Sequence, residues 1–202
     1  MDVIEGAVRL NRFGLERGRF WSAALLALAV FAPALLWTQW DGAVDGEEAV
    51  PSGTVITLEA SSNPGAVGKG RVWFTVPGDG WVTETGANRQ SAVTLVHSPV
   101  VVRTSAIGGV DDILVLFERQ ARDLRMGNRV LFATGSRDYV TPTGLTGYWG
   151  DLTGERYSGA LIVVGRGEVA AVIVAVAPLG RLEDQLGDLT NILATLEASD
   201  VE

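Results

Sequence analysis

His97 is the only histidine of this 202-residue chain, and Ser98 follows it directly. A histidine serves as general base for a serine nucleophile only when a third group orients its ring. No G-x-S-x-G or H-E-x-x-H pattern accompanies the pair, and Ser98 precedes Pro99, which is typical of a turn. We therefore interpret His97 as a structural residue of a strand, and we predict no catalytic residue in the chain.

Two pairs of carboxylates could do metal or acid–base chemistry. Asp111 and Asp112 could ligate a cation, whereas Asp151 and Glu155 flank an expected turn at 152–154 and could act as general acid and base. We interpret the second pair as exposed carboxylates of that turn. The first pair also suits the first turn of a helix, whose dipole favours negative charge. We expect neither a metal nor a cofactor. The chain has no cysteine, which excludes disulfides, thiol catalysis and thiolate metal sites.

Two adjacent aromatic residues are the candidates for a binding surface. Tyr148 and Trp149 lie between two glycines, and neighbouring residues of a strand point to opposite faces of a sheet. One ring is therefore expected in the core and the other at the surface or under a loop, where it could form part of a binding cleft. Trp149 is our candidate partner-binding residue, but core packing is the interpretation that we favour for these rings.

These residues depend on strands to position them. Strand composition and alternation predict eight strands, at 54–59, 71–76, 92–97, 100–105, 129–133, 146–153, 157–164 and 169–177. The last of these is apolar on both faces, which predicts a central strand covered on both sides. The glycine-rich connection 165–168 predicts a hairpin with the strand before it.

Two helices are expected to pack on these strands. The first is 110–126, with acidic residues in its first turn and Gly127 at its end. The second is 181–198, in which leucines recur at spacings of four and three: Leu182, Leu186, Leu189, Leu193 and Leu196. We interpret this stripe as core packing, with a short coiled-coil seam as the alternative. Strands, helix, strands, helix is the order of an α+β layered domain.

An uncharged run of 21 residues, 20–40, precedes this domain. A helix of that length, at about 1.5 Å per residue, matches the roughly 30 Å core of a bilayer, so the run predicts a transmembrane helix. Arginines precede the run and acidic residues follow it. By the positive-inside rule this predicts a cytoplasmic N-terminus and an extracytoplasmic domain at the plasma membrane. A cleaved signal peptide is the alternative.

Three residues of this run could contact a partner within the membrane. Ala23 and Ala27 have the small-x-x-x-small spacing that permits close helix approach, and Pro33 would kink the helix. We name Ala23, Ala27 and Pro33 as candidate partner-binding residues, and an integral membrane protein complex as the expected partner. The net charge of −8 argues against nucleic acid as a partner.

A short motif resembles one found in a known family. Phe74-x-Val76-Pro77-x-x-Gly80-Trp81, followed by a helix, a glycine hairpin and a leucine-rich helix, is similar to the PsbP-like fold family, which includes photosystem PsbP and LpqN-type actinobacterial envelope proteins. The motif has one extra residue between proline and glycine, and the chain lacks the cysteine of the lipoprotein members. Over 54–198 the resemblance implies an α/β/α sandwich used for binding proteins and stabilising assemblies.

Together these patterns predict an α+β fold: an N-terminal single transmembrane helix followed by an α/β/α sandwich with a central antiparallel sheet. The expected parts are a cytoplasmic tail 1–19, the span 20–40, a linker 41–53, the domain 54–198 and a tail 199–202. The expected function is that of a membrane-anchored accessory or scaffold subunit, which binds and stabilises a larger bacterial membrane or envelope complex. An extracytoplasmic small-ligand or lipid-binding module is the alternative.

Overall fold

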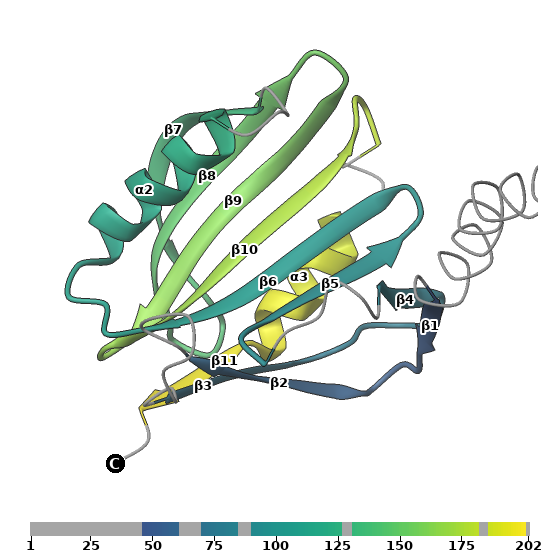
Figure 1. Cartoon of the computed structure of the whole chain (residues 1–202), viewed down its shortest axis with the longest axis horizontal. Helices are drawn as coiled ribbons and strands as arrows, with labels where there is room; N and C mark the ends of the chain where they lie inside the picture. Colours follow the sequence, from purple (N-terminus) through teal and green to yellow (C-terminus); the bar gives the residue numbers. More distant parts are fainter. Residues whose placement is uncertain (1–45, 61–69, 85–89, 127–130, 182–185, 201–202) are drawn as a thin grey trace, which may run out of the picture. The chain divides into compact units, whose positions relative to one another are not determined.

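The alternation of apolar and polar residues after Glu47 builds an antiparallel sheet of eight strands (Figure 1). The computed structural model describes residues 46–202 except 61–69, 85–89, 127–130, 182–185 and 201–202. In sheet order the strands are β1 (Glu47–Val50), β4 (Trp81–Glu84), β5 (Ala92–His97), β6 (Val100–Gly108), β10 (Val169–Pro178), β9 (Tyr157–Arg166), β8 (Thr146–Gly154) and β7 (Leu131–Val140).

The central pair of this sheet is β9 and β10, joined by a tight hairpin. Val169 pairs with Arg166, and the register continues without a break to Pro178 opposite Tyr157. Gly167 in the connection has φ +58, a conformation that glycine adopts without the steric cost of a side chain. The sequence predicts a strand covered on both faces at 169–177, and β10 buries both faces from Val169 to Ile173, whereas Val174 and Val176 are half-buried. The strand β9 is buried on both faces over most of its length.

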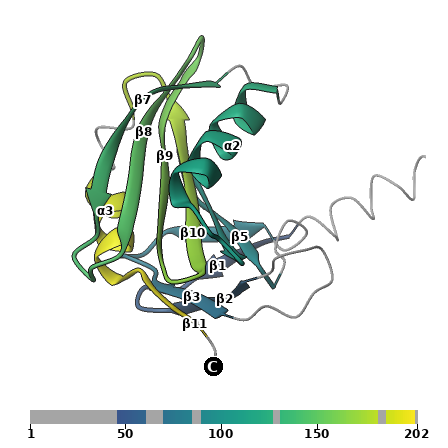
Figure 2. The same cartoon turned by 90° about the vertical axis from the view of Figure 1, so that its left-hand side faces the viewer.

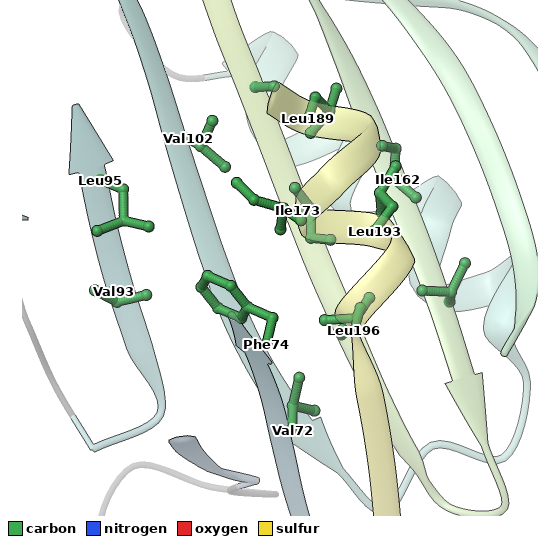
Figure 3. Packing of buried hydrophobic residues seen from close by; sticks show 14 of the residues in the cluster. Val72, Phe74, Val93, Leu95, Val102, Ile162, Ile173, Leu189, Leu193 and Leu196 are labelled. Atoms are coloured by element: carbon green, nitrogen blue, oxygen red, sulfur yellow. The ribbon is translucent and has the colours of Figure 1, made fainter. Parts of the chain in front are cut away.

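One face of the sheet, which we call the inner face, is covered by a smaller sheet and a helix. The small sheet has the order β11 (Glu197–Asp200), β3 (Gly70–Thr75) and β2 (Val55–Ala60), and the helix is α3 (Leu186–Thr195). Figure 3 shows Phe74 of β3 and Leu189 and Leu193 of α3 packed toward Ile162 and Ile173 of the large sheet. Leu189, Leu193 and Leu196 of the leucine stripe are therefore core, and the coiled-coil alternative is not needed to explain them.

The opposite, outer face carries the helix α2 (Ile113–Met126), which packs on β7, β8 and β9. Leu116 and Phe117 of α2 contact Leu152, Leu161 and Val163 of the sheet in a second buried cluster. The Asp112 carboxylate begins the helix, because its Oδ1 accepts hydrogen bonds from the backbone N–H groups of Leu114 (2.8 Å) and Val115 (3.2 Å). Figure 2 shows α2 and α3 on opposite sides of β8 and β9.

The edge strand β7 is longer than the sequence pattern predicts, and it is irregular. The pattern ends at Ala133, whereas the strand continues to Val140 after a shift of register between Thr134 and Arg137. Gly135, inside this shift, has φ +70, as in a bulge that places glycine in the left-handed region. The alternation signal stops at the bulge because the extra residue changes which side chains point outward.

The predicted α+β fold, an α/β/α sandwich behind a transmembrane helix, is wrong. The described residues are mostly strand, with eleven strands and two helices, and the layer opposite α2 is a three-stranded sheet together with α3. The predicted helix 181–198 is shorter, because Glu197–Asp200 pairs with β3 as β11. Within the described residues no helix has the length and apolar character to cross a bilayer. The predicted span 20–40 lies outside them.

Two short strands have no counterpart in the sequence prediction. β1 lies inside the stretch predicted as a linker and pairs with β4, for example Ala49 with Val82. β4 follows the turn at Pro77–Gly80 and pairs with β5 on its other side. Each has only four residues, which is too few for alternation to indicate a strand by itself.

Replacement of Leu189 by Asp tests the inner core. Leu189 is 3% exposed in the cluster between α3 and the sheet, so an unpaired carboxylate there should lower the free energy of unfolding by about 4 kcal/mol or more. Urea denaturation of the full chain measures the change, with Leu179→Asp as control because Leu179 is 54% exposed. Equal stability of the two variants would contradict the assignment of Leu189 to the core.

Candidate functional site

The structure separates the two aromatic residues of β8 as the two-residue period of a strand predicts. Tyr148 lies on the outer face, with its ring centroid 6.1 Å from that of Phe117 on α2. Trp149 lies on the inner face and packs at the edge of the core there, half-buried. Among the predicted partner-binding residues only Trp149 is described, because Ala23, Ala27 and Pro33 lie outside the described residues.

Trp149 is surrounded by residues of β7 and β8. The Tyr139 ring centroid lies 5.4 Å from that of Trp149, and the Arg137 guanidinium carbon lies 5.1 Å from the centre of the Trp149 ring. The indole Nε1–H donates to Asp151 Oδ1 at 2.8 Å, and Arg137 Nη1 lies 3.4 Å from the other oxygen of the same carboxylate. These contacts give the indole N–H a hydrogen-bond partner and cover part of the ring surface. They also join β7 to β8 beyond the bulge.

Burial raises the pKa of Tyr139 above its ordinary value of 10.0. In the unfolded chain the hydroxyl therefore loses its proton first as the pH rises. The contribution of Tyr139 to the free energy of unfolding is thus present below pH 10 and decreases as the pH rises through the raised value. Urea denaturation at several pH values above and below 10 should show a shallower loss of stability for Tyr139→Phe than for the parent. Identical slopes would contradict this.

His97 also has a partner that the sequence did not reveal. Its Nδ1 lies 3.1 Å from Asp188 Oδ2 at the start of α3, and its ring centroid lies 5.1 Å from that of Trp81. Within the described part of the chain no hydroxyl group is hydrogen-bonded to the other ring nitrogen, so the pair orients the imidazole without a nucleophile. Asp188 is 91 positions away, and no local pattern indicates such a contact.

The motif that contains Trp81 is explained by the turn before β4. The indole Nε1–H donates to the carbonyl oxygen of Pro77 at 2.6 Å, and Gly80 has φ +90. This closed turn directs Trp81 into the inner core, where it is 1% exposed. The motif therefore fixes packing in this chain, and we assign it no ligand.

The predicted carboxylate pairs do not form one site. Asp151 lies within β8 beside Trp149, and Asp111 and Asp112 line a cleft of about 550 Å³ between the start of α2 and the ends of β7 and β8, where Asp138 and Tyr148 also lie. Asp112 is the helix cap described above. Among the described residues no three metal-ligating side chains gather. The cleft mixes carboxylates with apolar groups, unlike the mostly apolar pockets that hold lipids.

The outer face of the large sheet continues past α2 without a cover. Pairing places one residue of each strand in a row across all eight strands: Ala49, Val82, Val96, Val101, Val176, Gly159, Leu152 and Ala133. Paired residues point to the same side of a sheet. Leu152 and Ala133 lie under α2, whereas Val101 is 37% exposed. The same apolar row is thus buried at one end and accessible at the other.

We call the accessible part of this surface the open valine face. It consists of the outer-face residues Val82, Val96, Val101, Val174 and Val176, with Arg103 exposed among them. Among these valines only Val101 is exposed; the other four are half-buried, and Val174 and Val176 pack against the cluster under α2. Figure 1 views the sheet from the side of α2 and shows that none of the described elements crosses in front of β5 and β6. Exposed clusters of apolar side chains on a folded domain mark interaction sites.

The sequence prediction missed this surface, although one signal was present. The run Val100, Val101, Val102 is apolar on both faces of its strand, which is typical of a strand covered on both sides. In the structure Val100 and Val102 are buried in the inner core, but Val101 is not covered. A run of valines whose first and last members are buried and whose middle member is exposed leaves an apolar position that a partner can cover.

Comparisons with known proteins bear on the fold. No protein-family model matches the sequence, and no curated protein matches it. Cyanobacterial PsbP (CyanoP) from Synechocystis sp. PCC 6803 is similar in structure, at 10% identity and a TM-score of 0.49, over 78% of this chain and 100% of that chain. The Ran-binding protein Mog1p of Saccharomyces cerevisiae is similar at 11% identity and 0.44, over 72% and 96%. The PsbP-like fold that the motif implied is confirmed, as a fold alone.

Proposed function

We propose that this chain is an accessory protein-binding module and that the open valine face is its docking surface. The observation that carries the proposal is the row of residues across the sheet. Its β7–β8 end is buried by α2, whereas its members on β4, β5, β6 and β10 are exposed or half-buried. Covering valines of this kind contributes about 25 cal/mol per Å² of apolar surface removed from water, which favours association.

The charge of the chain and the shape of the face favour a protein as the partner. The net charge is −8, which disfavours nucleic acids and anionic headgroups through electrostatic repulsion. The face is formed by side chains that stand on neighbouring strands, so it suits another protein surface better than a small molecule, which requires a concave site. We propose a binding role without catalysis for the whole chain.

The expected partner is an integral membrane protein complex, and this part of the proposal rests on the sequence alone. The supporting pattern is the uncharged run 20–40, with arginines before it and acidic residues after it. It would place the domain outside the plasma membrane, beside the extracytoplasmic parts of such a complex. The structure adds the face that would meet the partner.

The location can be tested with a protease. Protease added to intact spheroplasts should digest the segment after Gly42, because the proposal places it outside the membrane, and should leave the N-terminal tail protected. Antibodies against tags at the two ends report which part survives. Protection of the C-terminal tag, with digestion only after detergent is added, would contradict the proposed location and leave the docking face to be tested separately.

Replacement of Val101 by Asp tests the docking surface. The carboxylate would lie in the middle of the open valine face and should reduce partner binding at least tenfold, which corresponds to about 1.4 kcal/mol or more. The matched control is Val140→Asp, because Val140 is an exposed valine on β7 (61%) beside the cleft and outside the face. Both variants should melt close to the parent.

A photo-crosslinking amino acid at the same two positions supplies the measurement. In the native cells, position 101 should give one discrete adduct with a partner protein, and position 140 should not. A crosslinker at position 96 should give an adduct with the same partner, and the Val101→Asp change should remove this second adduct. A persistent adduct in the folded Val101→Asp variant would contradict the assignment of the face.

A further inference from the structure

The width of the open valine face limits what can cover it. Neighbouring strands lie about 4.8 Å apart, and an α-helix with its side chains is about 10 Å wide. The helix α2 accordingly packs on three strands, β7, β8 and β9. The next strands across the sheet are β10, β6 and β5. The strand β10 lies partly under α2, because Ala170 and Val172 belong to the α2 cluster and Val174 and Val176 pack against it. The room for one more helix beside α2 is therefore centred on β6 and β5.

The residues on these three strands form successive rows of different polarity. Val96, Val101 and Val176 make an apolar row, and the next row holds Thr94, Arg103 and Val174. Two residues along a strand span about 6.8 Å. One turn of a helix rises about 5.4 Å, or about 6 Å over four residues. A helix aligned with β6, as α2 is with its neighbouring strands (Figure 1), would therefore meet the two rows one turn apart.

Arg103 places a positive charge in the second row, and a partner that covers this row has to accommodate that charge. Its side chain is exposed, and it makes no hydrogen bond or ion pair with the described residues. Arg137, by contrast, is paired with Asp151 on the other face of the sheet. Covering an arginine without a partner is costly, since it loses water and gains no compensating charge. A partner that covers Arg103 should therefore bring a carboxylate to it.

We infer that the open valine face accepts one amphipathic helix of the partner, lying beside α2, with an apolar residue on Val101 and an Asp or Glu one turn away on Arg103. This inference rests on the proposed function. The helix would complete the outer layer that α2 begins. Its apolar stripe would have the spacing i, i+3, i+4, i+7 that such a surface requires.

A second copy of this chain fits the face poorly. The helix best placed to enter it would be α2 of the other copy, and the exposed residues of α2 are Val115, Glu118, Arg119, Arg122, Asp123 and Arg125. Only one of these is apolar, and three are arginines that would approach Arg103. The occupant is thus a helix of different composition, with acidic rather than basic residues next to its apolar stripe.

Disulfide capture can test the inference, because the full chain has no cysteine of its own. In the Ser105→Cys variant the single thiol would lie on the outer face of β6, two residues from Arg103. The probes are 14-residue helical peptides with leucines at i, i+3, i+4 and i+7, one cysteine, and either Glu or Lys one turn from a leucine. A third peptide carries a central proline that breaks the helix. Intact mass measures the fraction captured as the concentration of reductant is raised.

The Glu peptide should withstand about fivefold more reductant than the Lys peptide, the effect of a favourable surface ion pair. In the Arg103→Glu background the order should invert. A thiol at Val115, on the exposed side of α2, should show no preference. Three results would each overturn the inference. They are equal capture of the Glu and Lys peptides, capture of the proline peptide equal to that of the Glu peptide, and preferential formation of chain–chain disulfides. If the adduct at position 96 is nevertheless lost in the Val101→Asp variant, only the helical partner is wrong and the docking face stands.

Discussion

The pairing of β9 with β10 is the constraint on which the rest of this domain depends. These two strands are apolar on both faces, and most of their residues are buried by other parts of the chain, while Val174 and Val176 at one end of β10 stay half-buried. The inner face is covered by α3 and the small sheet, and the outer face by α2, so that one hydrogen-bonded pair contributes to two separate cores. The remaining strands extend this pair in both directions.

A sheet of eight strands is wider than the elements that cover its outer side. On the inner face the shortfall is small, because β2, β3 and β11 lie beside α3. On the outer face α2 covers β7, β8, β9 and part of β10, but not β6 and β5. The exposed Val101 and its half-buried neighbours are therefore a consequence of unequal coverage of the two faces by the same chain. The function that we propose follows from this asymmetry, and it requires no residue with unusual chemistry.

The sequence predicts those parts of the fold whose signals are local and repeated. The eight longer strands and the division of Tyr148 and Trp149 between two faces follow from strand composition and a period of two residues, and the hairpin at Gly167 follows from its turn residues. The helix predicted at 110–126 is present but begins only at Ile113, so Asp112 caps it instead of lying in its first turn. The sequence does not predict the four-residue strands β1 and β4, because four residues are too few to show a repeated alternation of apolar and polar side chains. The sequence does not predict β11, because Leu196 continues the helical spacing of leucines up to Glu197, where the chain begins to pair with β3. Which elements cover each face of the large sheet depends on segments that are far apart in the sequence, and so does the contact of His97 with Asp188. No local sequence pattern therefore predicts them.

The bulge in β7 has a consequence for how the molecule behaves beside other proteins. A ten-residue edge strand carries free backbone donors and acceptors that could template the addition of a foreign strand. The register shift at Gly135 interrupts that row of groups, and Arg137 and Asp138 place charge directly after it. Ordered growth from this edge is thereby discouraged. The proposed docking surface exposes apolar side chains on one face of the sheet. The irregular edge at β7 then limits aggregation by addition of further strands to this edge.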